Sequence, residues 1–419
     1  MSKRRRLYLF SPLPPQRNGL ADYIVEYLPY LTTQFDVYLV SESGLAAGAR
    51  QALAHVPALT VIDEAHFLAR QPEADAQTLY NVGNNVDCAY MLDYVHRWPG
   101  VVIVHDVSLF YLHQVAAHSG RLNSALGSWL VRDQYLLPDD LMGPDGSLTR
   151  TPGTLYQECL MLREIVASAQ GLMVHTNYAE QRLRGGALDI PIGSAAGKPL
   201  VRIPHFVLPP PKLDAHHVSQ VLERFDVQDG DFLMLVPGFL TGNKMLYEVM
   251  VAYDQVLHEL PNLKLVFAGE ERASEYPLSQ RISQRWPHAQ APKVTGYLDA
   301  IELDILLGRA DLSFVLRYPT YGESSGILPR AAMGGGDVVT VDIGAYPEFE
   351  SPLVTTVAVG RHVVSQLVAA IQASYGRWSQ GVNRGQRRLD EARRLERLLP
   401  HALYGRLKGL LDASWGMRS

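Results

Sequence analysis

Short apolar runs bounded by Gly, Pro or Asn alternate with longer stretches of helical periodicity along most of the chain. Such runs predict buried parallel strands, and the stretches between them predict helices that cover the faces of a sheet. We expect strands at residues 7–10, 37–40, 60–62, 79–82, 101–105, 171–175 and 201–203 in the first half, and at 232–236, 263–267, 293–295, 312–316, 337–341 and 354–357 in the second. The pattern predicts an α/β protein with two doubly wound, Rossmann-like parallel sheets in series.

The predicted boundary between the two sheets lies at three consecutive prolines, Pro209-Pro210-Pro211, which cannot donate ladder hydrogen bonds and stiffen the chain into a linker. We place this linker at residues 209–213. The prediction is an N-terminal domain over 1–208, a C-terminal domain over 209–395, and a helical tail over 396–419 that packs back across the domains. Ligands of open parallel sheets bind beyond the carboxyl ends of the strands, so two facing sheets predict an interdomain cleft.

The charge of the chain argues against a general nucleic-acid binder, because Lys+Arg 38 against Asp+Glu 43 leaves a net charge of −5. Residues 377–419 hold ten Lys/Arg and four Asp/Glu, so this segment carries +6 and the remainder −11. The basic segment is either a solvated helix face or a surface attracted to an anionic membrane or a lipid-linked substrate.

The apolar composition favours a protein that does not span a membrane. No apolar run approaches the ~18–20 residues of a membrane-spanning helix, and the basic start of the chain precedes an apolar segment too short for a signal peptide. We expect a cytoplasmic protein, with peripheral contact at the inner face of the membrane through the basic tail. Cys88 and Cys159 are its two cysteines, and we expect both to be plain core residues.

Polar residues follow the strands of the first predicted sheet. A long loop after residues 7–10 delivers Gly19 to the start of a helical pattern, where backbone N–H groups can approach an anion. The strand at 101–105 ends in His105, and the same sheet edge receives Arg17, Asn18, Asp22, Asn84, Asn85 and Asp106, which we expect to bind acceptor or sugar. Structural roles stay open here: a turn for the loop, a satisfied core position for His105, and a helix N-cap for Asp106. His113, His175 and His205 are weaker candidates.

The second predicted sheet begins with a strand that runs into a Gly-containing turn. Gly238 lies in this turn and Lys244 stands at the following helix start, an arrangement that suits a diphosphate. The next two strands are followed by Glu270 and by Tyr297, whose ring could stack on a base or cover the core. Asp229-Gly230-Asp231 resembles a metal-binding acidic pair, but it precedes a strand where a turn is expected. We predict no metal and no cofactor.

The densest group of candidate residues is 317–326, between a strand and a helical pattern. Arg317 can neutralise phosphate, Glu323 can accept hydrogen bonds from sugar hydroxyls, and Gly326 lets backbone amides come close. A plain solvated loop is a poor explanation for this packing of Gly, Glu, Arg and aromatic residues.

With these segments in view, the chain resembles retaining glycosyltransferase family 4, the nucleotide-sugar enzymes with the GT-B fold, particularly bacterial members of cell-surface polysaccharide assembly. The resemblance rests on the ordered segments SPLPPQRNGLADY, YNVGNN, VVIVHD, GFLTGNK, FAGEE, VTGYL, LRYPTYGESSG and DIGAYPEFE. It implies that His105 and Glu323 act on the transferred sugar and that the donor binds at Gly19, Gly238, Lys244, Glu270, Tyr297, Arg317, Ser325 and Gly326. It also implies retention of the anomeric configuration through front-face attack.

Two departures from the family pattern matter. The second Glu of the family motif would stand eight positions after Glu323, where the chain has Ala331, so ribose recognition by that residue is in doubt. The basic residue expected after the Gly of the second-domain turn is Phe239, which leaves Lys244 and Arg317 as the expected cations.

The resemblance implies a transferase that moves a sugar from a UDP-, GDP- or dTDP-sugar to a saccharide or lipid-linked saccharide in O-antigen, capsule or exopolysaccharide synthesis. Fixed cations aimed at a departing diphosphate would lower the barrier, which supports the same chemistry on physical grounds. The alternatives are a catalytically silent partner in a polysaccharide assembly complex and a nucleotide-sugar epimerase or phosphorylase on the same fold.

Overall fold

The computed structural model describes residues 4–70, 76–121, 144, 159–185, 197–208, 214–286 and 291–416. The chain divides into two compact units. The first comprises Met1–His205, Tyr321–Ser324 and Pro400–Ser419, and the second comprises Phe206–Thr320 and Ser325–Leu399. The proline linker predicted at 209–213 lies outside the described residues, and the division of the chain at 208 and 395 stays a prediction.

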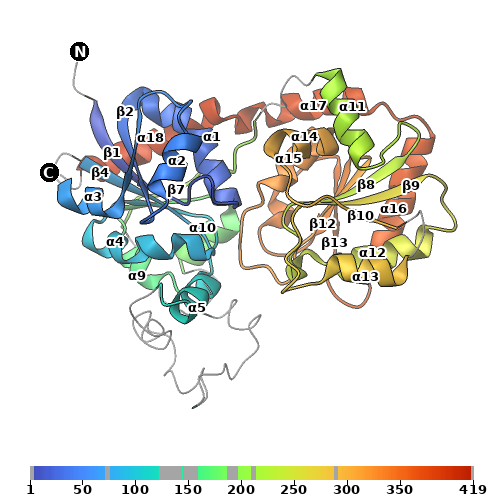
Figure 1. Ribbon diagram of the computed structural model, residues 1–419, viewed down its shortest axis with the longest axis horizontal. Coiled ribbons are helices and arrows are strands. Elements are labelled where there is room, and N and C mark those ends of the chain that lie inside the picture. Colours follow the sequence, from blue (N-terminus) through green and yellow to red (C-terminus); the bar gives the residue numbers. More distant parts are fainter. Residues whose placement is uncertain are drawn as a thin grey trace. The chain divides into compact units, whose positions relative to one another are not determined.

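A seven-stranded, all-parallel sheet with the order β3-β2-β1-β4-β5-β6-β7 forms the centre of the first unit (Figure 1). The strands follow one another outward from β1 in both directions, as in a doubly wound sheet. The strands are β1 (Arg5–Phe10), β2 (Phe35–Ser41), β3 (Leu59–Asp63), β4 (Ala76–Val82), β5 (Val101–Val104), β6 (Gly171–Val174) and β7 (Leu200–Arg202). Every strand predicted in the first half is confirmed, with differences of a few residues at the ends.

Helices cover the faces of this sheet. They are α1 (Gly19–Gln34), α2 (Ala46–Ala52), α3 (Glu64–Arg70), η1 (Val86–Met91), α4 (Leu92–Arg97), α5 (Phe110–His118), α9 (Arg163–Ser168), α10 (Asn177–Leu183) and α18 (Pro400–Gly416). The last of these belongs to the far end of the sequence and packs against α1, β5, β6 and β7. A hydrogen bond from the Gln77 side chain to the carbonyl of Leu411, 2.8 Å long, ties it to β4.

The second unit has a six-stranded parallel sheet with the order β10-β9-β8-β11-β12-β13. Its strands are β8 (Phe232–Pro237), β9 (Leu263–Ala268), β10 (Lys293–Val294), β11 (Leu312–Val315), β12 (Asp337–Val341) and β13 (Val354–Val357), which confirms the predictions for the second half. Its helices are α11 (Ala215–Arg224), η2 (Gly242–Lys244), α12 (Leu246–Val256), α13 (Leu278–Arg285), α14 (Ala300–Arg309), α15 (Ile327–Met333), η3 (Tyr346–Glu348), α16 (Val363–Ser379), α17 (Arg384–Leu395) and η4 (Glu396–Leu398).

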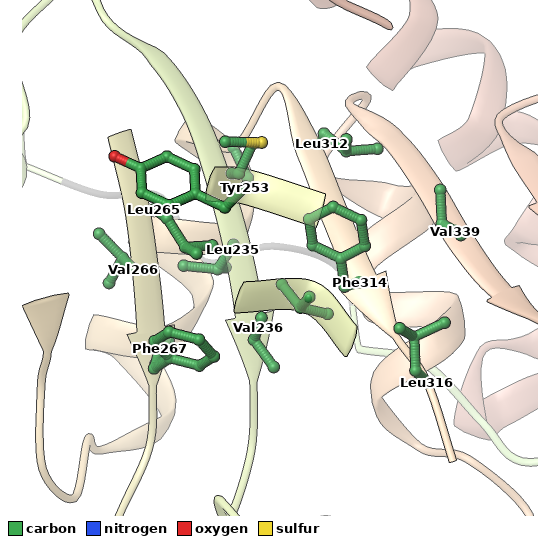
Figure 2. Packing of buried hydrophobic residues seen from close by; sticks show 14 of the residues in the cluster. Leu235, Val236, Tyr253, Leu265, Val266, Phe267, Leu312, Phe314, Leu316 and Val339 are labelled. Carbon is green, nitrogen blue, oxygen red and sulfur yellow. The ribbon is translucent and has the colours of Figure 1, made fainter. Parts of the chain in front are cut away.

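The core of the second unit consists of strand side chains packed against α12. Figure 2 shows Tyr253 of α12 beside Leu265 of β9 and Phe314 of β11. The central strands β8, β11 and β12 are buried along their whole length because helices cover both faces of the parallel sheet. This double burial is why short apolar runs predicted the strands well. Cys88 and Cys159 are both buried without a disulfide, as predicted.

Arg377, Arg384 and Arg387 of the basic segment make ion pairs with acidic residues of the second unit. Asp337 accepts hydrogen bonds from Ser374, Arg377 and Arg387, and Asp311 pairs with Arg384 at 3.0 Å. Burial raises the pKa of the Asp337 carboxyl, but the hydrogen bonds from these partners outweigh it, so the net shift is downward. The positive charges of Arg377, Arg384 and Arg387 are therefore paired within the second unit. Among the described residues no helix combines the length and apolarity that crossing a membrane requires.

Candidate functional site

His105 directly follows β5, and Asn81 of β4 holds its ring. Nε2 of His105 lies 2.6 Å from Oδ1 of Asn81, while the amide nitrogen of Asn81 donates to Oγ of Ser11 and to the carbonyl of Leu20. Because the Asn81 amide is oriented by these two acceptors, its oxygen must face the histidine and Nε2 must carry the proton. Nδ1 of His105 is then the nitrogen with a lone pair.

Three more rings surround His105 at the carboxyl end of the first sheet. Tyr23 of α1 meets the His105 ring edge-on at 4.7 Å, His175 follows β6 at 4.7 Å, and His205 follows β7 at 6.5 Å. Nδ1 of His175 donates to the carbonyl of Ile203 at 2.8 Å, which leaves a buried Nε2 that has no hydrogen-bond partner among the described residues.

Burial keeps His105 and His175 neutral at neutral pH. Burial, together with the neighbouring His175 and His205, holds the pKa of His105 well below 6.5, and burial with His205 lowers the pKa of His175 to about 3. A neutral imidazole donates one hydrogen bond through its protonated nitrogen and accepts one at the other, but it is a poor proton donor to a leaving group.

Glu323 lies in the segment Tyr321–Ser324, which groups with the first unit. The backbone N–H of Ser324 donates to the carbonyl of His105 at 3.3 Å, and that of Ser108 donates to the carbonyl of Tyr321 at 3.2 Å. Gly322 has φ +76°, and a Cβ there would lie 2.0 Å from a methyl group of Val107, so only glycine allows this approach. The two predicted catalytic residues, His105 and Glu323, are thus brought to neighbouring backbone segments.

The Glu323 side chain is buried, with 7% of its surface exposed. One of its oxygens, Oε2, accepts a hydrogen bond from the backbone N–H of Tyr321 at 2.7 Å. A carboxylate fixed in this way is oriented by its own loop, which is what a group that must meet a sugar hydroxyl requires.

The loop before α1 ends at Asn18, whose side chain caps the helix by accepting from the N–H of Ala21 at 2.9 Å. Gly19 is the first helical residue and is exposed, with open space where a Cβ would lie. Helix geometry leaves its amide without an intrahelical acceptor. Arg17 and Asp22 are exposed on either side of it, so Gly19, Arg17 and Asp22 all lie on the surface near the carboxyl end of β1.

Asn84, Asn85 and Asp106 hold neighbouring loops together. The N–H of Asn84 donates to Oδ2 of Asp106 at 2.6 Å, Oδ1 of Asn84 accepts from the N–H of Leu112 at 2.9 Å, and Asn85 caps η1. The alternative reading of Asp106 as the N-cap of the next helix is wrong, because α5 begins at Phe110 after Leu109. His113 is buried and bonded to the carbonyl of Leu109 within the same helix.

In the second unit, the turn after β8 folds Lys244 back over Gly238. Gly238 has φ +90°, and Nζ of Lys244 lies 3.0 Å from the carbonyl of Pro237. A Cβ on Gly238 would come within 3.2 Å of that ammonium group. The strand end, the glycine and the lysine therefore form one compact turn, which α12 continues from Leu246.

Arg272 is a cation that the sequence alone did not single out. Its guanidinium lies 4.7 Å from the centre of the Phe239 ring and pairs with Glu270 at 3.2 Å. The Tyr297 ring lies 6.4 Å from that of Phe239, and 41% of the Tyr297 surface is exposed. Phe239, which replaces the expected basic residue, thus has a basic residue stacked on it.

The end of β11 leads to Arg317, which is partly buried. Oγ of Ser325 accepts from the N–H of Leu328, in the first turn of α15, at 3.1 Å. The N-cap of this helix is Gly326, whose φ of −72° is open to any residue. Ala331 is 1% exposed and belongs to the apolar core. A carboxylate at that position would lie among apolar side chains.

The acidic sequence Asp229-Gly230-Asp231 forms a turn, as expected. The N–H of Gln228 donates to the Asp231 side chain at 2.8 Å, and the N–H of Asp231 donates back to the Gln228 carbonyl at 3.1 Å. Over the described part of the chain, no group of three or more His, Cys, Asp or Glu side chains has an arrangement that would hold a metal ion.

Comparison with known proteins places this geometry in a fold. No protein-family model matches the chain, and the search of curated protein sequences gives no match. Among solved structures the chain is similar to HepE of Anabaena in complex with UDP-glucose, with a TM-score of 0.66 at 12% identity over 98% of this chain and 100% of that one.

Two further structures show the same likeness. A glycosyltransferase of Rickettsia africae has a TM-score of 0.59 at 14% identity, over 98% of both chains. Sucrose-phosphate synthase of Thermosynechococcus elongatus has a TM-score of 0.59 at 13% identity, over 98% of this chain and 100% of that one. Together with the two parallel sheets, these similarities show that the chain has the GT-B fold and confirm the predicted fold class.

Proposed function

We propose that the protein is a retaining glycosyltransferase of family 4 that moves a sugar from a nucleoside-diphosphate sugar to a saccharide or lipid-linked saccharide. The observation that carries the proposal is the hydrogen bond from the Ser324 amide to the His105 carbonyl, which joins the loop of Glu323 to the end of β5. The GT-B fold and the ordered segments quoted above support the same chemistry. A role in cell-surface polysaccharide assembly rests on the resemblance alone.

His105 and Glu323 are the residues we assign to the transferred sugar. Nδ1 of the neutral His105 ring would accept a hydrogen bond from a sugar hydroxyl, and the Glu323 carboxylate would accept from another. The N-terminal amide of Gly19 would contact the donor. Arg17, Asn18, Asp22, Asn84, Asn85 and Asp106 stay proposed acceptor or sugar contacts, although Asn18, Asn84, Asn85 and Asp106 also have structural hydrogen bonds.

Lys244 and Arg317 are the proposed diphosphate cations. Cleavage of the bond between C1 of the sugar and the diphosphate oxygen leaves negative charge on the departing group, and fixed cations stabilise that charge as it develops. The acceptor oxygen would attack C1 from the face that the diphosphate leaves, and its proton would pass to a departing phosphate oxygen. Gly238, Ser325 and Gly326 would line this part of the donor site through their backbone.

Tyr297 is the proposed contact for the nucleobase, and Phe239 is its neighbour. Arg272 lies against the Phe239 ring and pairs with Glu270. HepE is described with UDP-glucose bound, which makes UDP-sugars the first donors to test here. Position 331, where a second Glu would bind the ribose, holds Ala331, which is a core residue. The ribose would therefore need another contact.

The test is a transfer assay followed by NMR of the product. The protein is incubated with UDP-, GDP- or dTDP-sugars and a panel of saccharide acceptors, and the anomeric proton coupling of the new linkage is measured. The proposal predicts a product with the donor's configuration, which His105→Ala and Glu323→Gln abolish. Release of free or epimerised sugar without an acceptor, or phosphate-dependent cleavage, would favour an epimerase or phosphorylase.

A catalytically silent partner in an assembly complex is the remaining alternative. It predicts no turnover with any donor while the fold is intact. Contact of the basic tail with an anionic membrane is a separate part of the proposal, and the ion pairs of Arg377, Arg384 and Arg387 with Asp337 and Asp311 reduce the charge available for it.

A further inference from the structure

A pocket of about 450 Å³ lies in the first unit, away from the His105 ring. Helices α3 and α4 contribute to its lining, together with Glu42 and Ser43 directly after β2, Ala89 and Tyr90 of η1, and Arg121. The two helices are held together by Phe67 of α3, whose ring meets those of Tyr94 and Trp98 edge-on at 5.8 and 5.2 Å. The volume lies in the range typical of small-molecule sites.

One wall of the pocket is apolar. Tyr94 and Trp98 are stacked on each other at 5.6 Å, and Leu68 on the facing helix is 39% exposed. Trp98 stacks on Tyr94 and has the Arg97 guanidinium 4.5 Å from its ring centre, so Leu68 provides the main apolar contact for the C–H groups of a ligand.

The rest of the lining contains both carboxylates and guanidinium groups. Glu42, Glu64 and Asp93 face the pocket together with Arg97 and Arg121. Arg121 lies 3.6 Å from Glu42, and Glu64 accepts two hydrogen bonds from Ser43 at 2.8 Å. Five charged groups of both signs give a small net charge, so the lining suits a ligand with many neutral donors and acceptors better than a strongly charged one.

One buried acceptor in this lining has no partner. Oε2 of Glu42 is shielded from solvent and makes no hydrogen bond among the described residues, although the side chain as a whole is 21% exposed. Burial raises the pKa of Glu42, against the opposing charge of Arg121. A hydroxyl donor from a ligand would satisfy this oxygen.

The pocket connects to the proposed reaction site through a chain of polar contacts. Arg121 lies 3.7 Å from Asp87, and Asp87 accepts a hydrogen bond of 2.8 Å from the Asn18 side chain, next to Gly19. These contacts place the pocket beside the loop that precedes α1.

We propose that this pocket binds one or two rings of a saccharide chain, whose hydroxyls meet the carboxylates and guanidinium groups and whose C–H groups lie against Leu68. The binding itself does not depend on transfer. Its use in holding an acceptor some rings away from the reacting hydroxyl rests on the proposed function.

The test is binding without any nucleotide-sugar donor. Maltose, cellobiose, chitobiose and mannobiose, with spermidine and choline as cationic probes, are titrated into the full-length protein and followed by saturation-transfer NMR and calorimetry. Leu68→Ser and Asp93→Ala remove exposed side chains from the pocket lining. Ile301→Ser and Asp229→Ala remove exposed side chains of the same kinds from the second unit and serve as matched controls.

The proposal predicts that at least one disaccharide binds and that each pocket variant weakens its binding by fivefold or more, while both controls bind as the wild type does. Unchanged melting curves would show that the variants are folded. The proposal is overturned if no disaccharide binds, if the pocket variants bind normally, or if only spermidine or choline binds. Because no donor is present, failure of this proposal and failure of glycosyl transfer are separate results.

Discussion

Oδ1 of Asn81 lies 2.6 Å from Nε2 of His105, and this contact determines which nitrogen of the ring can meet a substrate. The amide of Asn81 is itself oriented by Ser11 and Leu20. The strand β4 therefore sets the tautomer of a histidine on the neighbouring strand end, and Nδ1 is left as the acceptor.

Asn81→Asp should make transfer dependent on pH. A carboxylate beside the ring favours the charged imidazolium and raises the pKa of His105. A protonated ring has lost its acceptor nitrogen, so we expect kcat/KM to fall by about tenfold as the pH drops from 8 to 5.5. The wild-type profile should show no titration of this ring over that range. An unchanged profile in Asn81→Asp would contradict the role given to Nδ1.

The buried histidines should make the first unit sensitive to acid. Burial lowers the pKa of His175 to about 3, against ~6.5 in an unfolded chain. A lowered pKa in the folded state gives stability that is present above pH 6.5 and is lost as the pH falls towards 3. Between pH 6.5 and 5 this amounts to about 2 kcal/mol for one ring.

His175→Asn should reduce this loss by about the same 2 kcal/mol, since asparagine can still donate to the carbonyl of Ile203. Hydrogen exchange of the amides in β5 and β6 at several pH values measures the first unit alone. His118→Asn changes an exposed histidine and is the control. Equal acid sensitivity of wild type and His175→Asn would show that the cluster does not carry the effect.

Lys244→Met should weaken donor binding. The ammonium group lies at the turn after β8, where we place the diphosphate, and loss of one charge-assisted contact of about 1.5–3 kcal/mol raises KM for the donor by roughly 10–100-fold. Lys293→Met removes an exposed lysine of the same unit and should leave KM unchanged. Equal KM values in the two variants would show that Lys244 does not contact the diphosphate.

Tyr297→Ala should raise KM for the donor by about tenfold with little change in kcat. Stacking of an aromatic ring on a base contributes about 1–3 kcal/mol, and such a contact is made equally in ground and transition states. The matched control is Tyr247→Ala, which removes a tyrosine of the same unit that is 57% exposed. A fall in kcat without a change in KM would place Tyr297 outside the base site.

The central strands could be predicted from sequence because they are short apolar runs buried on both faces. The grouping of Tyr321–Ser324 with the first unit could not, because it depends on the approach of Gly322 to Val107, more than two hundred positions earlier. Such a contact has no local periodicity.

The candidate site was partly predictable for the same reason. Parallel strands end at one edge, so His105, His175 and His205 could be expected there, and the structure places their rings together. Asn81 was missed although a polar residue inside an apolar strand is a signal. Arg272 was missed because it lies in an irregular segment after β9, where only the packing against Phe239 reveals it.

The most direct measurement is the melting temperature of the purified protein with UDP, GDP, dTDP, ADP or CDP, each with and without magnesium. A nucleotide at a hundred times its dissociation constant adds about 2.7 kcal/mol, roughly 5–10 °C for units of this size. The account predicts a shift of this order with at least one nucleotide, independent of magnesium and lost in Lys244→Met. No shift with any of the five would contradict the assignment of a nucleotide-sugar site.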